Sequence, residues 1–149
     1  MTKQKICIIG NGLAGLTTAA ILSKQSISID LYSNKKQSKN SDNRTTAISN
    51  SNYQFIKSNL NLNKTNFFWT CKKINLFYEN GKKIINFLNF NEKNKKFMHI
   101  FQNKFLKDRL DKIVSSKKNI KIIKKNIEEI NTERGFVVQN KKKVFYDLI

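Results

Sequence analysis

The sequence contains no proline, two cysteines, three arginines and no long apolar run. Without proline, no loop is stiffened by a fixed φ angle or held by a cis peptide bond. Cys7 and Cys71 lack the spacing of a metal site, and we expect no disulfide between them. No stretch approaches the roughly 18 apolar residues that span a bilayer, and the N-terminus lacks the apolar segment of a secretory signal. These absences predict a cytoplasmic protein that holds no metal.

Acidic residues are also scarce. Ten Asp and Glu oppose 29 Lys and Arg, which gives a formal net charge of +19. Such a field attracts phosphate backbones and anionic lipid whatever the fold. The surplus is lysine, however, whereas base readout and planar phosphate clamps favour arginine, which occurs only as Arg44, Arg109 and Arg134. Lysine, asparagine and isoleucine are the residues that AT-rich codons encode. We therefore interpret the charge as an incidental basic surface and keep a lysine-rich nucleic-acid-binding protein as an alternative.

What the sequence does have is a hydrophobic content of 39%, with eleven phenylalanines, enough for one folded domain over residues 1–149. Residues 5–9 form a short apolar run that ends at a glycine and predicts a buried parallel strand. A helix to about residue 24 and an alternating strand over 27–31 follow, before a polar loop at 33–43. The pattern predicts a β-α-β unit and hence an α/β fold.

The middle of the chain changes to an antiparallel pattern, which we place as an insertion over residues 67–100. Before it, Ser49 is suited to cap a short helix that ends near Leu60. Alternating residues from 73 to 90, interrupted by Asn80 and Gly81, predict a β-hairpin with a type I′ turn. The aromatic residues before the hairpin, Phe67, Phe68 and Trp69, are expected to pack between the two parts of the domain rather than to stack on bases.

The last third predicts one helix and several strands. A helix is expected from about 103 to 115, with this apolar face: Phe101, Phe105, Leu106, Leu110, Ile113 and Val114. A buried strand over 120–123 follows, and then an antiparallel meander of strands around 127–130, 135–139 and 144–149. Asn140 and the lysines 141–143 read as the turn of a hairpin in this meander. The predicted architecture is thus an incomplete Rossmann-like domain with an antiparallel insertion and a C-terminal β-meander.

A glycine fingerprint lies between the first strand and the first helix. It has the form GxGxxG and reads Gly10, Asn11, Gly12, Leu13, Ala14, Gly15. In this context the first glycine permits a tight turn, the second lets a diphosphate approach the backbone, and the third lets helix and strand pack closely. The N–H groups of the first helical turn then meet the phosphate charge. The fingerprint predicts dinucleotide binding.

Two further stretches narrow this prediction. One is Asp42 to Ser49, with Arg44 at its centre, and the other is Ile100 to Leu106. Together with the glycine fingerprint they resemble the FAD-dependent aromatic-ring hydroxylases of ubiquinone biosynthesis, monooxygenases of the para-hydroxybenzoate-hydroxylase type. The resemblance implies FAD as cofactor, NAD(P)H as reductant, O2 as oxidant and a phenolic quinone precursor as substrate. It also implies a cytoplasmic enzyme, with peripheral association with the inner membrane as an alternative.

The resemblance also assigns residues to the cofactor. Arg44 matches the family's cationic contact to FAD, and Gln102 matches a residue beside the ribityl and ribose groups. Arginine offers a fixed fork of donors to diphosphate oxygens, and an amide can both donate to and accept from sugar hydroxyls. A plain helix N-terminus capped by Asn103 is the alternative for Gln102 and Asn103.

Two departures from the family stand out. Ser33 occupies the end of the second strand, where a carboxylate is expected to hold the ribose, and Asp30 lies too early and on the opposite side from Leu31. The family's later cofactor motifs are also missing, so we expect a truncated N-terminal portion that does not hydroxylate by itself. Another FAD- or NAD-dependent oxidoreductase domain remains an alternative.

No residue can be given a catalytic role from the sequence. His99 is the only histidine and has no second ligand at metal spacing, so we expect it to be structural. No Ser-His-Asp, Cys-His or paired-carboxylate arrangement is visible. The acid, base and nucleophile are therefore left unassigned.

Overall fold

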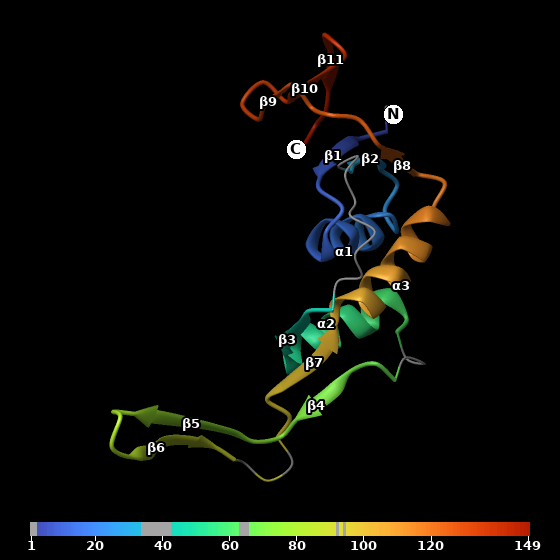
Figure 1. Ribbon diagram of the computed structural model, residues 1–149. Coiled ribbons are helices and arrows are strands. Elements are labelled where there is room, and N and C mark those ends of the chain that lie inside the picture. Colours follow the sequence, from blue (N-terminus) through green and yellow to red (C-terminus); the bar gives the residue numbers. More distant parts are fainter. Residues whose placement is uncertain (1–2, 34–42, 63–65, 92, 94) are drawn as a thin grey trace. The chain divides into compact units, whose positions relative to one another are not determined.

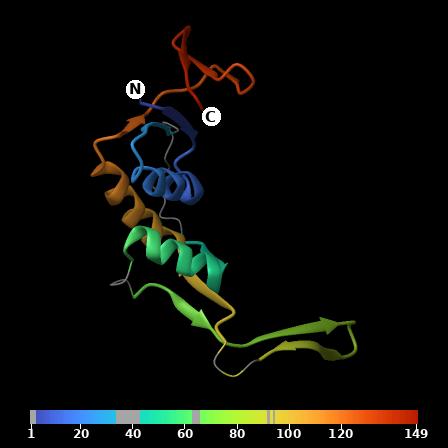
Figure 2. The same cartoon turned by 180° about the vertical axis from the view of Figure 1, so that it is seen from behind.

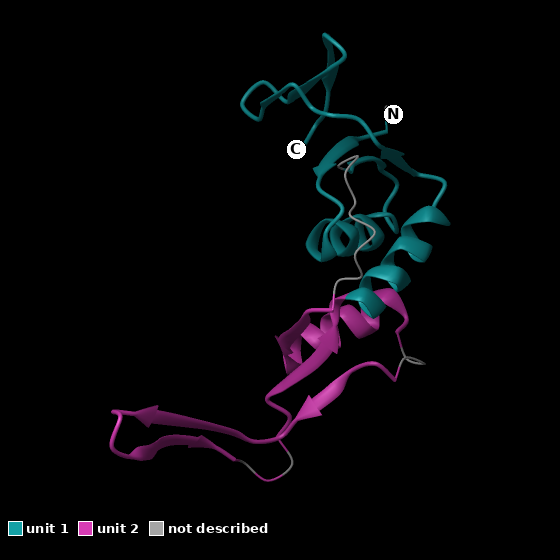
Figure 3. Ribbon diagram, viewed as in Figure 1, with its two compact units in different colours: residues 1–42, 104–149 teal, residues 43–103 magenta. Residues whose placement is uncertain are grey.

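The computed structural model describes residues 3–33, 43–62, 66–91, 93 and 95–149. The chain divides into two compact units (Figure 3). Unit 1 combines residues 1–42 with 104–149, and unit 2 comprises residues 43–103. The expected loop at 33–43 falls almost wholly outside the described residues.

Unit 1 is built on a parallel sheet in the order β1-β2-β8 (Figure 1). Strand β1 (Lys5–Ile9) leads into helix α1 (Leu13–Leu22), and the chain returns through β2 (Ser28–Tyr32). Helix α1 covers one face of the sheet and buries Leu16, Ala19 and Ala20. The small alanines let the helix approach the strands closely. The predicted β-α-β unit is confirmed.

Strand β8 (Ile120–Ile123) is the edge of this sheet and pairs in parallel with β2. The prediction that it is buried is wrong, because an edge strand leaves one side to solvent, and Ile122 is 40% exposed. At the other edge, Leu148 bridges Ile6 in parallel, and the Cys7 N–H donates to the Leu148 carbonyl at 2.8 Å. Part of the strand expected at 144–149 therefore belongs to the parallel sheet.

The C-terminal strands form the predicted antiparallel meander, in the order β11-β10-β9. These are β9 (Glu129–Asn131), β10 (Phe136–Gln139) and β11 (Lys142–Phe145). Asn140 and Lys141 both have positive φ, the requirement of a two-residue type I′ hairpin turn. Residues of the meander pack on the face of the parallel sheet that α1 leaves free, in a cluster made of Cys7, Tyr32, Val137 and Tyr146.

Helix α3 (Asn103–Ser115) has the predicted bounds. Its apolar face buries Leu106, Leu110 and Val114 almost completely. Two residues assigned to that face depart from the prediction: Phe101 lies in a strand, and Phe105 is 45% exposed.

Unit 2 contains an antiparallel sheet that the sequence did not predict, in the order β3-β7-β4. Its strands are β3 (Thr45–Ser49), β7 (Met98–Gln102) and β4 (Trp69–Cys71). Helix α2 (Asn50–Leu60) lies against this sheet (Figure 2). The helix begins where predicted, because the Ser49 hydroxyl accepts a hydrogen bond from the Asn52 N–H at 3.2 Å.

The aromatic residues expected to bridge two parts of the domain behave differently from one another. Phe68 packs on Tyr53 and Phe101 within unit 2, at ring-centroid distances of 5.0 and 5.2 Å. Trp69 is 50% exposed. Phe68 is therefore a packing residue, as expected, but its ring contacts lie inside unit 2 rather than between two parts of the domain. Trp69 is half exposed because it lies on the short edge strand β4.

The predicted hairpin is also present, as β5 (Ile74–Glu79) and β6 (Ile84–Phe90). Its turn differs from the prediction, because Gly81 has positive φ and Lys82 does not. Positive φ at the first central position alone is the pattern of type II′. Asn80 Oδ1 accepts hydrogen bonds from the N–H groups of Lys82 and Lys83, which holds this geometry. Among the described helices, none is long and apolar enough to cross a membrane.

Candidate functional site

The glycine fingerprint forms a tight turn between β1 and α1. Gly10 adopts a φ of +107°, a conformation that side-chain-bearing residues rarely adopt, and its N–H donates to the Tyr32 carbonyl at 2.9 Å. Gly12 caps the helix without a side chain, and its carbonyl accepts the first helical hydrogen bond from Leu16 at 3.0 Å. The turn therefore links the end of β1 to the end of β2 by a hydrogen bond, and helix α1 begins directly after Gly12.

The space around the glycines at positions 12 and 15 differs. A Cβ atom added at Gly15 would collide with the Gly10 carbonyl oxygen and would lie 3.5 Å from Ile8 Cγ2. A Cβ atom added at Gly12 would meet nothing within 4 Å. Gly15 is thus required by packing, whereas the space beside Gly12 is open for a ligand.

The start of α1 is suited to an anion. Helix geometry leaves the N–H groups of Leu13, Ala14 and Gly15 without an intrahelical acceptor, and the helix dipole adds partial positive charge there. The first turn of α1 carries no acidic residue. This arrangement can bind a diphosphate through backbone donors.

A cleft of about 400 Å³ opens beside the turn, beyond the carboxyl ends of the parallel strands. Its walls are formed by Ile9, Gly10, Tyr32, Ser33, Lys125, Asn126 and Ile127. Open α/β sheets bind their ligands at this end of the strands. Ser33 therefore lies where the sequence predicted the ribose contact, in the same cleft as Gly10.

Lys125 is a cleft residue that sequence reasoning missed. The β2–β8 register pairs Tyr32 with Ile123, and the Ser33 N–H donates to the Ile123 carbonyl at 2.9 Å. The chain leaving β8 therefore passes beside the end of β2 and carries Lys125 into the cleft wall. Only the pairing of strands about 90 positions apart reveals this neighbour, and no local sequence signal marks it.

Arg44 and Gln102 belong to unit 2, where the structure brings their two motifs together. Strands β3 and β7 pair so that Thr45 lies opposite Gln102, and the Asn103 N–H donates to the Arg44 carbonyl at 2.9 Å. Thr46 Oγ1 donates to Asn103 Oδ1 at 2.6 Å. The two stretches that carry the resemblance to the ubiquinone hydroxylases are far apart in the sequence, and they are neighbours in one sheet. Their contact with a cofactor stays a prediction.

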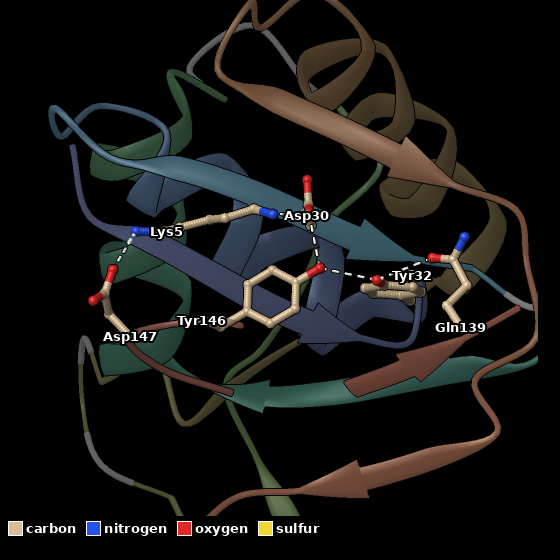
Figure 4. A network of polar contacts seen from close by, with 6 residues as sticks. All are labelled: Lys5, Asp30, Tyr32, Gln139, Tyr146 and Asp147. Atoms are coloured by element: carbon tan, nitrogen blue, oxygen red, sulfur yellow. Dashed lines mark hydrogen bonds and ion pairs between the residues drawn. The ribbon is translucent and has the colours of Figure 1, made fainter. Parts of the chain in front are cut away.

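Asp30 takes part in a buried polar network and is not free for a ribose (Figure 4). Its carboxylate accepts a hydrogen bond from the Tyr146 hydroxyl at 2.8 Å and lies 3.0 Å from Lys5 Nζ. The Tyr146 hydroxyl in turn lies 2.9 Å from that of Tyr32, which is 3.2 Å from Gln139 Oε1. Asp30 therefore anchors the C-terminal meander to β2, which explains an acidic residue inside a buried strand.

Burial shifts the ionisation of the groups in this region. It raises the pKa of the Tyr146 hydroxyl, and the hydrogen bonds with Tyr32 and Asp30 raise that pKa further. Burial also raises the pKa of the Cys7 thiol to about 11, with a contribution from the Asp30 charge. These groups stay neutral near pH 7, so they serve as packing and hydrogen-bonding groups rather than as nucleophiles or bases.

His99 is placed as a structural residue in unit 2. It is 2% exposed and stacks on Tyr53 at a ring-centroid distance of 3.7 Å. Its Nε2 lies 3.1 Å from Asn50 Oδ1 and its Nδ1 lies 3.4 Å from Thr70 Oγ1, so a neutral ring with the proton on Nε2 satisfies both. Burial lowers the pKa of His99, and the charges of Lys96 and Lys57 lower it further. No group of three potential metal ligands occurs in the described parts of the chain.

Several solved structures share this fold. Xcc4156, a flavin-dependent halogenase from Xanthomonas campestris, matches 99% of this chain with a TM-score of 0.69 and 12% identity, over 41% of its own chain. The 2-methyl-3-hydroxypyridine-5-carboxylic acid oxygenase matches 99% with a TM-score of 0.66 and 13% identity, over 38% of its chain. CtdE, solved in complex with FAD, matches 98% with a TM-score of 0.65 and 15% identity, over 37% of its chain. No protein-family model and no curated protein matches the sequence.

At these identities the similarity establishes the fold. The chain shares with these three proteins an α/β fold that combines the parallel sheet, the antiparallel sheets and the C-terminal strands. It spans about two fifths of the length of the solved chains that it matches.

Proposed function

We propose that this chain is the FAD-binding N-terminal portion of a flavin-dependent monooxygenase that hydroxylates a phenolic precursor of ubiquinone. The observation that carries the proposal is the glycine turn. It combines an open position at Gly12, helical N–H groups without acceptors and a cleft at the carboxyl ends of parallel strands. These features suit a dinucleotide diphosphate. The fold shared with flavin-dependent enzymes supports flavin as the second half of that dinucleotide.

Each unit carries residues that we assign to FAD. The N–H groups after Gly12 would bind the diphosphate, and Ser33 would bind the adenosine ribose. Arg44, directly before β3, and Gln102, at the end of β7, are neighbours in unit 2, and both would contact the cofactor. FAD supplies the chemistry when bound, by accepting electrons from NAD(P)H and activating O2 for transfer to an electron-rich ring.

The substrate and the reductant belong to the proposal for the whole enzyme. The resemblance of residues 42–49 and 100–106 to the ubiquinone hydroxylases supports a phenolic quinone precursor, NAD(P)H and association with the membrane surface. The fold shared with an oxygenase and a halogenase supports oxygen-dependent flavin chemistry more generally. We expect this chain to bind the cofactor and expect hydroxylation to require the rest of such an enzyme.

Titration of the purified chain with FAD and with riboflavin tests the proposal. Riboflavin carries the flavin ring without the diphosphate and adenosine, so it lacks the part that the glycine turn would hold. We expect FAD to bind at least about tenfold more tightly than riboflavin, as measured by flavin fluorescence at physiological salt. Equal affinities would show that the turn does not recognise the diphosphate and would contradict the proposal, as would the absence of FAD binding.

A further inference from the structure

One face of the β5–β6 hairpin is apolar over its whole length. In an antiparallel pair, residues directly opposite each other point to the same face, and so does every second residue along a strand. Five of the six residues on this apolar face are between 39% and 58% exposed, and the sixth, Ile74, is partly buried. The register arranges them in three facing pairs: Ile74 with Phe90, Leu76 with Leu88, and Tyr78 with Ile85.

The opposite face of the hairpin has a polar residue in each of its facing pairs. These pairs are Asn75 with Asn89, Phe77 with Asn86, and Glu79 with Ile84. The Asn86 side-chain amide donates to Asn89 Oδ1 at 2.8 Å, which agrees with a shared polar face. The hairpin is therefore amphipathic.

The apolar face is available to a binding partner. A two-stranded hairpin alone is marginally stable in water and gains stability when its apolar face packs against another surface. Strands β5 and β6 pair only with each other among the described strands. The Phe90 ring packs against Phe97 at a centroid distance of 6.1 Å, whereas Tyr78 and Ile85, near the turn, are 58% and 47% exposed.

Lysines flank this face at both ends. Lys72 and Lys73 directly precede β5, and Lys82 and Lys83 follow the Gly81 turn, all four being exposed. Residues 72–96 contain seven lysines, two glutamates and no arginine. An apolar face bordered by lysines complements a surface in which negative charges lie over an apolar layer, and a bilayer with anionic lipids has this structure.

Other partners match one of these two features. A second copy of the chain would complement the apolar face but not the lysines. A nucleic acid would complement the lysines, but four of the six residues on the apolar face are aliphatic and offer no ring on which a base can stack. The combination therefore favours the lipid surface.

We propose that the β5–β6 hairpin binds the surface of bilayers that contain anionic lipids. Its apolar face lies at the boundary between headgroups and acyl chains, and its lysines pair with the anionic headgroups. The outer edges of β5 and β6 have no strand partner among the described strands, so their N–H and C=O groups keep the hairpin out of the hydrocarbon interior. This inference rests on the membrane association in the proposed function and assigns it to one element.

Flotation with lipid vesicles at about 0.15 M salt tests the inference. One set of vesicles contains phosphatidylcholine alone, and the other contains phosphatidylcholine and phosphatidylglycerol. Aggregated protein does not rise with vesicles, so flotation reports lipid binding separately from self-association. We expect the chain to bind the vesicles with phosphatidylglycerol at least about tenfold more tightly than the neutral ones.

Paired substitutions on the two faces locate the contact. Tyr78→Thr combined with Ile85→Thr removes one facing pair from the apolar face, and threonine keeps the preference for strand. This variant should bind anionic vesicles at least about tenfold more weakly. The matched control combines Phe77→Thr with Ile84→Thr on the opposite face, where the side chains are 58% and 69% exposed, and should bind like the wild type.

A second pair of variants tests the lysines at constant net charge. Lys82→Gln combined with Lys83→Gln removes two charges beside the apolar face and should weaken binding to anionic vesicles about tenfold or more. Lys118→Gln combined with Lys142→Gln removes two exposed charges from unit 1. This control should bind like the wild type.

The outcomes separate this inference from the FAD proposal. Absence of binding to anionic vesicles, or equal binding to neutral and anionic ones, would overturn the inference. Equal losses in a variant and its control would also overturn it, because the whole basic chain would then be attracted without a defined surface. If the apolar-face variant altered only self-association, or only binding to a single-stranded oligonucleotide, a second copy or a nucleic acid would be the partner instead.

FAD titration of the same variants completes the comparison. Vesicle binding that fails while FAD binding is retained would overturn this inference alone. Vesicle binding that is retained while FAD binding fails would contradict the proposed flavin site and leave the lipid-binding surface standing.

Discussion

Single residues in the glycine turn separate what the fold needs from what a ligand needs. Position 15 has no room for a side chain, because a Cβ atom added at Gly15 would collide with the Gly10 carbonyl oxygen. Gly12 has an ordinary backbone conformation, with φ −73° and ψ −178°, and open space where its Cβ would stand. The fingerprint predicted close packing at Gly15 and approach of a diphosphate at Gly12. The geometry confirms the close packing at Gly15 and leaves the space at Gly12 open.

Gly15→Ala is expected to destabilise the chain by about 2 kcal/mol, because a methyl group forced into a packed contact shifts the helix from the strand. Urea denaturation followed by circular dichroism measures this loss. Gly12→Ala serves as the matched control and should cost less than about 1 kcal/mol, the effect of a poorer helix cap. Equal losses for the two variants would show that the close contact at Gly15 is not a packing constraint.

His99 gives the molecule a pH dependence with a defined direction. Its pKa is lowered from 6.5 by burial and by neighbouring lysines, so the unfolded chain binds a proton at pH values where the folded chain does not. Stability is therefore fully present above the unfolded pKa and is lost as the pH falls through 6.5 toward the lowered folded value. Because His99 is the only histidine, the change in unfolding free energy between about pH 7.5 and 5.5 should come mainly from this residue. His99→Gln should flatten this dependence, and an unchanged slope in the variant would contradict the assignment.

At the scale of elements, the C-terminal meander is attached to the parallel sheet by the Asp30 network. Tyr146 supplies the central hydroxyl, bonded to Asp30 at 2.8 Å and 2.9 Å from the Tyr32 hydroxyl. Backbone bonds between Lys5 and Asp147 and between Cys7 and Leu148 add to this attachment. The network thus compensates a buried charge while it fixes the meander.

Tyr146→Phe should reduce the unfolding free energy by roughly 1–3 kcal/mol, because it removes a hydrogen bond from a buried carboxylate. Tyr78→Phe removes the same atom from a side chain that is 58% exposed and should have almost no effect. Denaturation curves of the two variants measure the difference. Similar small effects would show that the Asp30 carboxylate does not depend on the Tyr146 hydroxyl.

The β5–β6 hairpin is the element with the largest apolar exposure. Phe77, Ile84 and Phe87 are 58%, 69% and 61% exposed, and the two strands pair only with each other among the described strands. Such a surface favours self-association. Replacing the three residues with threonine should keep the strands and shift sedimentation toward monomer without lowering the melting temperature. A wild-type chain that sediments as a monomer at the same concentration would contradict this expectation.

The elements that the sequence predicted are those with local signals. Strand β1, helix α3 and the Ser49 cap match the predicted bounds because hydrophobic periodicity and capping chemistry act over a few residues. The β3-β7-β4 sheet was missed because its strands are short and pair across long stretches of sequence, about 50 positions between β3 and β7 and about 30 between β4 and β7. Ser33 was correctly placed at the end of β2, whereas Lys125 entered the cleft through long-range pairing that no local pattern encodes.

At the scale of the whole molecule, the net charge of +19 affects every binding measurement. Any polyanion or anionic nucleotide is attracted at low salt, and this attraction weakens as salt screens it. Specific recognition by the glycine turn depends instead on backbone donors and on the open space at Gly12. A test of function must therefore change the shape of the site and leave the charge of the chain unchanged.

FAD titration of the wild-type chain and of Gly12→Ala, at an ionic strength of about 0.15 M, meets this requirement. The substitution keeps the charge and the fold and places a methyl group in the open space that a diphosphate would occupy. The wild-type chain should bind FAD, and the variant should bind it at least about tenfold more weakly. FAD binding that is equally tight in both chains, or absent from the wild type, would contradict the account.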